Sequence, residues 1–400
     1  MPSACQYSPA PLINTIRRPR LKRSESRILT THTGSLPRSP VQQDVLLARE
    51  ERREFDPSTL DTSIREAVAE VVQMQIDMGI DVINDGEQGR SQYATYVKER
   101  LSGYEGEPKV QVWERLDDRD FPEYAEVRPK GSQLMPQPVC TGPIAWKDFG
   151  AVQKDIDNLQ AATSGYEPEE VFMTSASPGV IANFLRNDYY PDHESYMHAL
   201  ANVMKDEYKA IVDSGLLLQI DCPDLAMTRP SQWAHLTTEE FLKIVELHVE
   251  IINQALAGLP EDRMRLHLCW GNTEYAHNHD VPIKDLLPIV LKARPMGLSF
   301  EGANPRHAHE YKVWKDVKLP DGKVLLPGVL DTTTNFVEHP ELVADRITRY
   351  AEAVGRENVI ASTDCGFGTS AWGRRVDTRI AWAKLASMVE GARIASQELW

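Results

Sequence analysis

RLHLCWG, residues 265–271, and VIASTDC, residues 359–365, are short apolar runs that end in polar side chains. Runs of this length and composition are typical of strands buried in a parallel sheet. Six more occur along the chain, at residues 28–35, 81–87, 171–178, 216–221, 297–301 and 324–331. Helical periodicity fills most of the intervals, at residues 63–78, 195–214, 238–257, 340–354 and 378–397. Eight strand–helix repeats predict an α/β fold, a (β/α)8 TIM barrel.

Reactive side chains gather where these predicted strands end. His267 and Cys269 are two positions apart, so their side chains leave the same face of a strand. Glu301 and Cys365 end two of the other predicted strands, and active sites of such barrels form at the C-terminal strand ends. Imidazole, two thiolates and a carboxylate form a donor set that suits Zn²⁺. We predict a zinc site made by these four residues, against the alternative of a packed histidine beside a buried thiol.

The donor set also indicates a kind of chemistry. A carboxylate is the exchangeable member of such a set, and a catalytic zinc keeps one exchangeable position. Zinc with two thiolates and a carboxylate is a poor activator of water, but it can hold a substrate thiolate and keep it nucleophilic at neutral pH. The sequence therefore predicts a small-molecule thiol substrate that accepts a carbon group from an alkyl donor.

Two segments depart from the strand–helix rhythm. Residues 103–170 are rich in proline, glycine and charge, and we expect an insertion after the second strand, with a small β excursion and a lid-like loop. Residues 28–400 would otherwise form one catalytic barrel. Residues 1–27 carry six basic side chains, one acidic side chain and four prolines. This composition predicts a disordered basic N-terminal tail.

Composition excludes several functional classes. The formal net charge is −15, from 59 acidic and 44 basic side chains, whereas nucleic acids and anionic membranes bind clustered positive charge. No apolar run reaches the roughly 18 residues of a membrane span. Five scattered cysteines are no disulfide framework.

We expect a cytoplasmic protein with neither nucleic-acid nor membrane partners. A mitochondrial transit peptide in residues 1–27 is the alternative, although its prolines would interrupt an amphipathic helix. The oligomeric state does not follow from the sequence.

Several motifs together resemble one known family, that of the catalytic barrel of cobalamin-independent methionine synthase, across residues 28–396. They are TTHTGSLPRS at residues 30–39, DGEQGR at 85–90, LQIDCPDLA at 218–226, RLHLCWGN at 265–272, LSFEGANPR at 298–306 and ASTDCGFGT at 361–369. The resemblance implies a zinc-dependent S-methyltransferase of methionine biosynthesis. Such an enzyme moves the methyl group of 5-methyltetrahydropteroyltriglutamate, a methyl-folate, to homocysteine without cobalamin.

The resemblance also implies roles for individual residues. Zinc would be bound through the four residues predicted above, with homocysteine displacing one of them. Ser35, Glu87 and Asp221 would hold the carboxylate and ammonium groups of the amino acid. Glu87, Asp221 and Asp331 are our candidates for catalytic residues.

Two departures leave the alkyl donor open. The full-length plant and bacterial enzymes carry a second barrel, and this chain has room for one. Their seventh-strand motif carries a histidine thought to protonate the departing folate, whereas Thr333 occupies that position here. Threonine cannot act as a general acid near pH 7. The resemblance therefore implies the zinc–thiol half of the reaction and leaves the pteridine donor open.

Single-barrel relatives suggest an alternative electrophile. GEQGRSQYATYVKERLSGY, residues 86–104, resembles a subgroup that includes the epoxyalkane:coenzyme M transferases. Arg90 and Tyr93 would then bind on the electrophile side. The first alternative function is therefore zinc-activated addition of a thiol to an epoxide or another electrophile in specialised metabolism. The second is a non-catalytic zinc-bearing scaffold barrel.

Other chemistry-bearing residues receive structural interpretations. Cys222 alternates away from Asp221 and is expected to be a core thiol. Asp364 alternates away from Cys365 and is expected to orient a ligand. Two pairs of histidines spaced two apart fall in predicted loops, where this spacing gives no common face, and are interpreted as solvated. They are His277 with His279 and His307 with His309.

Overall fold

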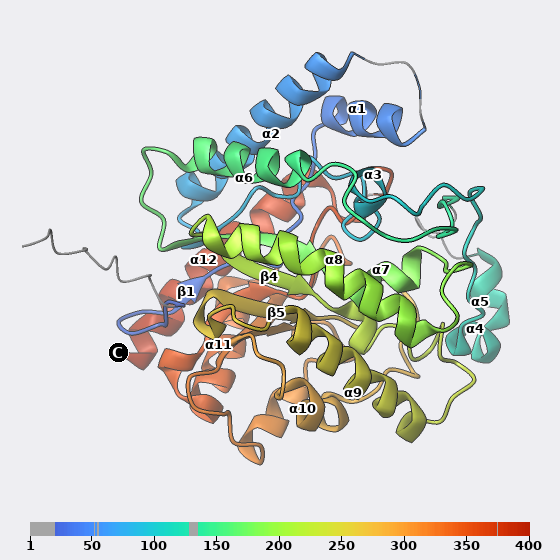
Figure 1. Ribbon diagram of the computed structural model, residues 1–400. Helices are drawn as coiled ribbons and strands as arrows, with labels where there is room; N and C mark the ends of the chain where they lie inside the picture. The colour runs from blue at the N-terminus through green and yellow to red at the C-terminus, as the bar shows by residue number, and fades with distance from the viewer. Residues whose placement is uncertain (1–20, 52, 54–55, 128–134, 374) are drawn as a thin grey trace, which may run out of the picture.

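The computed structural model describes residues 21–51, 53, 56–127, 135–373 and 375–400. Within them, eight strands pair in parallel in the order β1-β8-β7-β6-β5-β4-β3-β2, a nearly closed barrel surrounded by helices (Figure 1). The strands are β1 (Leu29–Thr30), β2 (Val82–Ile83), β3 (Glu170–Ala176), β4 (Leu217–Asp221), β5 (Met264–Leu268), β6 (Gly297–Phe300), β7 (Val324–Leu330) and β8 (Ile360–Thr363). Each lies within or one residue outside a predicted run, and the predicted (β/α)8 barrel is confirmed.

Side-chain hydrogen bonds join the two short strands that complete the ring. Asp81 Oδ2, just before β2, accepts hydrogen bonds from the Thr30 backbone N–H at 2.8 Å and from the Thr30 hydroxyl at 2.9 Å. Thr31 donates its hydroxyl to the carbonyl of Val82 at 2.9 Å. These bonds satisfy backbone groups at the β1–β2 junction and bring the loop after β1 beside the loop after β2.

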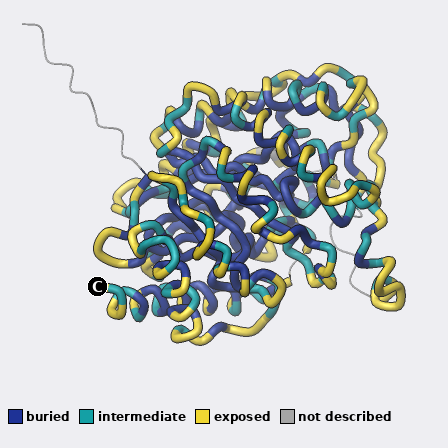
Figure 2. The backbone as a smooth tube through the Cα atoms, turned by 90° about the horizontal axis from the view of Figure 1, so that it is seen from below, coloured by how far each residue is buried: buried dark blue, intermediate teal, exposed yellow. Residues whose placement is uncertain are grey.

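Helices cover the outside of the strand ring (Figure 1). The α-helices are α1 (Pro40–Glu50), α2 (Pro57–Met78), α3 (Val97–Arg100), α4 (Leu116–Asp120), α5 (Pro122–Val127), α6 (Gly150–Thr163), α7 (Pro178–Phe184), α8 (His193–Asp213), α9 (Thr238–Ala255), α10 (Ile283–Val290), α11 (Pro340–Val354) and α12 (Thr378–Leu399). Short 3-10 helices are η2 (Pro223–Leu225), η3 (Glu261–Arg263), η4 (Glu310–Lys315) and η5 (Arg356–Asn358). Because helices cover one face of each strand and the barrel interior the other, β4 to β8 are buried throughout, and burial concentrates in the centre (Figure 2).

The insertion differs from its prediction as a small β excursion and a loop. Apart from Glu170, which begins β3, its described residues pair in isolated bridges such as that between Lys109 and Gln137, and they contain three helices, α4, α5 and α6. α6 buries Val152, Ile156 and Leu159, which recur at helical spacing on one face. This helix lies beside α2 in the outer layer (Figure 1), so the final part of residues 103–170 belongs to the barrel itself.

The N-terminal prediction is wrong for its last residues. Leu21 is buried against Phe172 and other side chains at the N-terminal ends of the strands. Ser24 is fully buried and donates to the carbonyl of Val359, and Arg27 is paired with Asp81. Residues 21–27 therefore pack against the N-terminal end of the barrel. They can do so because Leu21 and Ser24 interrupt the run of basic side chains and can be buried. Residues 1–20 lie outside the described part of the chain. Among the described helices, none is long and apolar enough to cross a membrane.

Candidate metal and thiol site

Three of the four predicted metal ligands meet at the C-terminal end of the barrel. His267 lies within β5, Cys269 follows that strand, and Cys365 lies two residues beyond β8. One ligand atom from each lies within 4.8 Å of the other two, and all three residues are buried. The Sγ atoms of Cys269 and Cys365 are 3.8 Å apart. The barrel thus assembles a compact donor cluster from strands that are nearly 100 residues apart in sequence.

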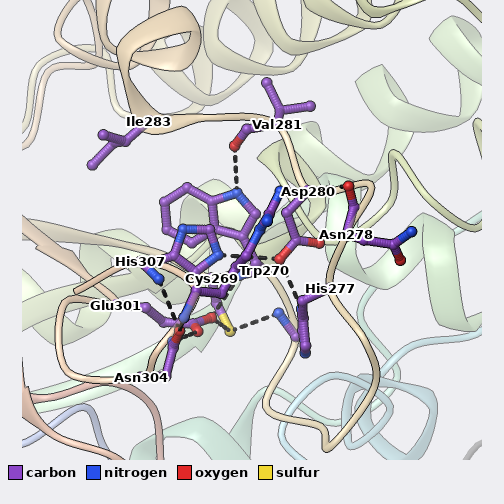
Figure 3. A network of polar contacts seen from close by, with 12 residues as sticks. Cys269, Trp270, His277, Asn278, Asp280, Val281, Ile283, Glu301, Asn304 and His307 are labelled. Atoms are coloured by element: carbon purple, nitrogen blue, oxygen red, sulfur yellow. Dashed lines mark hydrogen bonds and ion pairs between the residues drawn. The ribbon is translucent and has the colours of Figure 1, made fainter. Parts of the chain in front are cut away.

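Glu301, the fourth predicted ligand, lies beside this cluster. Its Oε1 is 3.1 Å from Cys269 Sγ and accepts a hydrogen bond from the backbone N–H of Trp270 at 2.7 Å. Its Oε2 accepts a hydrogen bond from the side-chain amide of Asn304 at 2.6 Å (Figure 3). Both carboxylate oxygens are therefore oriented by neighbouring groups while one of them faces the thiol.

Asp364 holds the loop that follows Glu301. Its Oδ1 accepts hydrogen bonds from the backbone N–H groups of Gly302 and Ala303, and its Oδ2 from that of Asn304, each at 2.8 Å. These contacts support the expectation that Asp364 orients a ligand, because Asp364 fixes the backbone next to Glu301.

The protonation and burial of the cluster residues suit a bound metal ion. His267 Nδ1 faces Asp221 Oδ1 at 3.3 Å, while His267 Nε2 is buried without a partner among the described residues. A proton on Nδ1, shared with Asp221, leaves the Nε2 lone pair free for a metal. The hydrogen bond to Cys365 and then burial hold the pKa of the Cys269 thiol well above its usual range. A bound cation is the group that would satisfy this nitrogen and these sulfurs.

A cavity opens onto the cluster and contains the predicted substrate residues. Its empty space, including the open mouth, is about 800 Å³, and its lining includes Ser35, Glu87, Tyr93 and Asp221 together with the three ligands. Ser35 is brought to the cluster by the loop after β8, because Phe367 donates its backbone N–H to the Ser35 carbonyl at 2.8 Å.

Glu87 is held in an unusual backbone conformation. It follows β2 by four residues and has a φ of 55°, which is uncommon for a residue other than glycine and is often found at functional sites. Thr174 donates its hydroxyl to Glu87 Oε1 at 3.0 Å, while Oε2 is buried without a partner among the described residues. Burial raises the pKa of Glu87 to about 7; Arg90 opposes the rise and Asp221 adds to it. A cationic group between Glu87 and Asp221 would favour both ionised carboxylates.

Two predicted residues lie away from this cavity. Arg90 is buried behind it: its guanidinium donates to the hydroxyl and the carbonyl of Thr174 and stacks over the ring of Tyr96. Arg90 is not among the lining residues of this cavity, and its side chain supports the β3 end. Its contact with substrate stays a prediction. Asp331 accepts hydrogen bonds from the Thr333 N–H and hydroxyl and lines a separate cavity that borders Glu301. Its catalytic role stays a prediction.

A buried ionic network supports the cluster from the side of β5 and β6 (Figure 3). The ring of His307 stacks on Trp270 with centroids 4.1 Å apart. His307 Nδ1 faces Glu310 at 2.8 Å, and Nε2 faces Asp280 at 3.1 Å. Asp280 also contacts His277 Nδ1 at 2.7 Å. The interpretation of His277 and His307 as solvated is wrong, because carboxylates in nearby loops meet them inside the protein.

Other residues that line the cavity carry little signal in the sequence. Gln92 and Arg375 line the cavity, as do Asn272, Thr273 and Tyr275 from the loop after β5. They come from loops without a periodic pattern, and their only signal is that they follow predicted strand ends. Cys222, in contrast, is a fully buried core thiol, as expected.

The fold and site define a class: (β/α)8 barrels with an imidazole–thiolate–carboxylate cluster at the C-terminal strand ends. Residues 28–118 and 170–393 match the family model of the cobalamin-independent synthase catalytic domain. The chain belongs to this family, which confirms the resemblance of its motifs.

Relatives match over nearly the whole chain. The methionine synthase of Sulfolobus acidocaldarius is 26% identical over 372 residues, which cover 92% of this chain and 93% of the relative. That of Saccharolobus solfataricus is 26% identical over 373 residues, covering 92% and 95%. A B12-independent methionine synthase structure from Shewanella sp. W3-18-1, in complex with selenomethionine, is similar in fold with a TM-score of 0.70 at 21% identity. It covers 93% of this chain and 99% of that one.

Proposed function

We propose that this protein is a zinc-dependent enzyme that transfers a methyl group to the thiol of homocysteine and so forms methionine. The observation that carries the proposal is the meeting of His267, Cys269 and Cys365 within 4.8 Å, in a cavity that also contains Glu87 and Asp221. The cluster suits a thiolate-binding metal, and the carboxylates suit the ammonium group of an amino acid. The names of the methionine synthase relatives support the same reaction.

Zinc fits the donor set better than magnesium or calcium do, because two of the donors are thiolates. His267, Cys269 and Cys365 would hold it, with Glu301 as the exchangeable oxygen donor. Bound there, zinc supplies a positive charge that lowers the pKa of a substrate thiol and keeps its sulfur nucleophilic.

The residues of the chain position the substrate. Glu87 and Asp221 bind the ammonium group of homocysteine, and Ser35 binds its carboxylate. The sulfur then attacks the methyl carbon: a sulfur–carbon bond forms as the bond from that carbon to the donor breaks, and the electron pair stays on the donor. Correct placement of sulfur and carbon supplies much of the rate enhancement.

Zinc-edge X-ray absorption, with and without homocysteine, tests the metal and the thiol together. The expected result is a site with two sulfur ligands that gains a third when homocysteine binds. A matched variant, Cys140→Ala, removes a buried thiol that belongs to neither the cluster nor the lining of its cavity, and should leave the sulfur count unchanged. Zinc that ignores homocysteine contradicts the thiol assignment, and a folded protein that binds no zinc contradicts the mechanism.

One observation favours thiol addition to an epoxide as a second candidate. Thr333 stands where the family carries a histidine, whereas the Tyr93 side chain lines the same cavity as the cluster. Opening of an epoxide by sulfur leaves an alkoxide, which is basic enough to take a proton from a tyrosine hydroxyl. Thiol consumption measured with methyl-folate and with propylene oxide separates the candidates. Loss of the epoxide reaction alone in Tyr93→Phe would support the second.

A further inference from the structure

Two side chains inside the barrel lie one layer below Asp221 and His267. Gln219 precedes Asp221 by two residues in β4, and Arg265 precedes His267 by two residues in β5. Side chains two positions apart leave a strand on the same face. The two strands are paired so that Gln219 lies opposite Arg265, and Asp221 lies opposite His267 in the same way. Gln219 and Arg265 therefore form a cross-strand pair that supports the pair at the cavity.

Arg265 is a buried cation whose hydrogen-bond partners are neutral groups. It is 1% exposed. Its Nε donates to Gln219 Oε1 at 2.7 Å, and its terminal nitrogens donate to Thr31 Oγ1 at 3.1 Å and to the carbonyl of His32 at 2.8 Å. The guanidinium carbon also lies 3.5 Å from the centroid of the Phe172 ring. A buried charge held by neutral groups costs more than an apolar side chain of similar size, so packing alone does not explain an arginine here.

The neighbours of the Gln219 side chain fix the orientation of its amide group. A guanidinium can only donate hydrogen bonds, so the amide oxygen has to face Arg265. The amide nitrogen then donates to Asp221 Oδ1 at 2.7 Å and to the carbonyl of Thr33 in the loop after β1. Carboxylate and carbonyl oxygens can only accept, so the reversed amide would be mismatched with all three neighbours. Arg265 therefore selects the orientation in which Gln219 donates to Asp221.

The two hydrogen bonds of the Asp221 carboxylate end on the same oxygen atom. Oδ1 accepts a hydrogen bond from Gln219 at 2.7 Å and faces His267 Nδ1 at 3.3 Å. The second oxygen is then left for an occupant of the cavity that Asp221 lines. A carboxylate that turned away from Gln219 would lose its alignment with His267 and with the occupant together.

We propose that Arg265 and Gln219 are positioning residues that make the site selective for a thiol carrying an ammonium group. Arg265 orients the Gln219 amide, and Gln219 holds Asp221 with one oxygen on His267 and the other available to the ammonium group. The selectivity rests on the proposed function, because it takes the ammonium group of homocysteine as the partner of Asp221. The effect on His267 does not depend on the thiol.

Two variants remove the hydrogen bond to Asp221 in different ways. Gln219→Glu keeps the size of the side chain and gives Arg265 an ionic partner, so it is expected to fold, but an oxygen replaces the amide nitrogen. Arg265→Met keeps a long side chain without the donor that orients the amide. Arg263→Met is the matched control. It removes a buried arginine that pairs with Glu170 just before β5, at the opposite end of the barrel from the cavity.

Calorimetry on the zinc-loaded enzyme compares homocysteine with 4-mercaptobutyrate, which differs from it by the missing amino group. We expect the wild type to prefer homocysteine. Gln219→Glu and Arg265→Met should each reduce this preference about tenfold or more, as loss of a hydrogen bond to a charged group predicts. Their affinity for 4-mercaptobutyrate should stay near the wild-type value. Arg263→Met should keep the wild-type preference even though it lowers stability.

Zinc affinity, measured by competition with a chromophoric chelator, is the second readout. Weaker alignment of Asp221 with His267 should lower the affinity about three- to tenfold in Gln219→Glu and Arg265→Met, and not in the control. A purely structural role predicts that both thiols bind more weakly by the same factor, and this result would overturn the proposal. So would a Gln219→Glu variant with the thiol preference and the zinc affinity of the wild type.

Failure of the proposed function gives a different result. If the wild type binds homocysteine no more tightly than 4-mercaptobutyrate, the substrate assignment is wrong and the selectivity falls with it. The zinc affinities then decide the rest: lower values in Gln219→Glu support a positioning role toward His267, and unchanged values overturn it. If Arg265→Met does not fold, Gln219→Glu alone decides between these outcomes.

Discussion

Asp364 accepts a hydrogen bond from the backbone N–H of Asn304 at 2.8 Å, although β7 lies between the strands that carry these residues. The contact depends on Gly328 in β7, where a Cβ atom would lie 2.0 Å from Asp364 Oδ1. Asp364 precedes Cys365, and Asn304 donates its side-chain amide to Glu301. One carboxylate therefore links the loops that carry two of the proposed ligands.

Asp364→Asn should weaken zinc binding without removing a ligand. The new amide nitrogen cannot accept from a backbone N–H, so at least one of three hydrogen bonds is lost beside Glu301. Loss of such supporting contacts typically lowers metal affinity about 10- to 100-fold. Competition with a chromophoric chelator measures the change, and Asp188→Asn, an exposed site, serves as control. An unchanged zinc affinity would show that the loop after Glu301 does not need the hydrogen bonds to Asp364.

Gly328→Ala tests the same link from the other side. The added methyl group meets the Asp364 carboxylate and its backbone, so Asp364 must move or β7 must shift. We expect overpacking to cost about 1–3 kcal/mol of unfolding free energy, together with weaker zinc binding. Urea denaturation and chelator competition give the two values. A variant with the unfolding free energy and the zinc affinity of the wild type would contradict the close approach of Gly328 to Asp364.

Cys365→Ser should lose zinc and methyl transfer while the barrel stays folded. The hydroxyl is a poor donor for zinc beside thiolate and imidazole, and Cys365 lies beyond the end of β8, outside its strand pairing. Metal content by mass spectrometry and far-UV circular dichroism are the two measurements. A zinc-replete, fully active variant would refute the ligand assignment.

The strands and the cluster were predictable because their signals are local and periodic. His267 and Cys269 share a strand face at a spacing of two, and β7 reads as one apolar run because both of its faces are buried. α6 carried the same kind of signal in Val152, Ile156 and Leu159, but the composition around it obscured the period.

The remaining features depend on contacts that the spacing of residues does not encode. Arg90 lies in a loop motif beside Glu87, yet its side chain turns to Thr174 on another strand. His307 is buried because Asp280, from the preceding loop, and Glu310 offer it two carboxylates. Burial of a charged residue requires partners, and these become neighbours only when the barrel closes.

Glu87→Gln should stabilise the substrate-free protein at pH 8 and weaken homocysteine binding. The Glu87 pKa of about 7 lies above its usual value of 4.5, because burial favours the protonated carboxyl group. The protonated group therefore contributes its full stabilisation below pH 4.5, and this stabilisation is lost as the pH rises through 7. Glutamine has no such dependence. Thermal unfolding at pH 5 and pH 8 tests the first part: the variant should gain relative to wild type at the higher pH.

The affinity of Glu87→Gln for homocysteine tests the second part. Loss of a hydrogen bond to a charged group predicts about 10- to 100-fold weaker binding, which calorimetry can measure. Glu66→Gln changes an exposed glutamate of α2 and should alter neither property. Equal stability differences at pH 5 and pH 8, with tight homocysteine binding, would remove Glu87 from the site.

His307→Gln should destabilise the protein by about 3 kcal/mol near pH 7.5, because it leaves the buried Glu310 carboxylate without its cation and leaves Asp280 with His277 alone. Burial lowers the pKa of His307, but Asp280 and Glu310 more than offset this effect and raise it to about 10. The stabilisation is therefore fully present below pH 6.5 and is lost as the pH rises through about 10. Urea denaturation at pH 7.5 and pH 10.5, at one zinc concentration, should show a stability difference that narrows at the higher pH. His279→Gln removes a more exposed histidine paired with Asp120 and should cost less than about 1 kcal/mol. Equal costs for the two variants at pH 7.5 would mean that His307 is not the buried cation of this network.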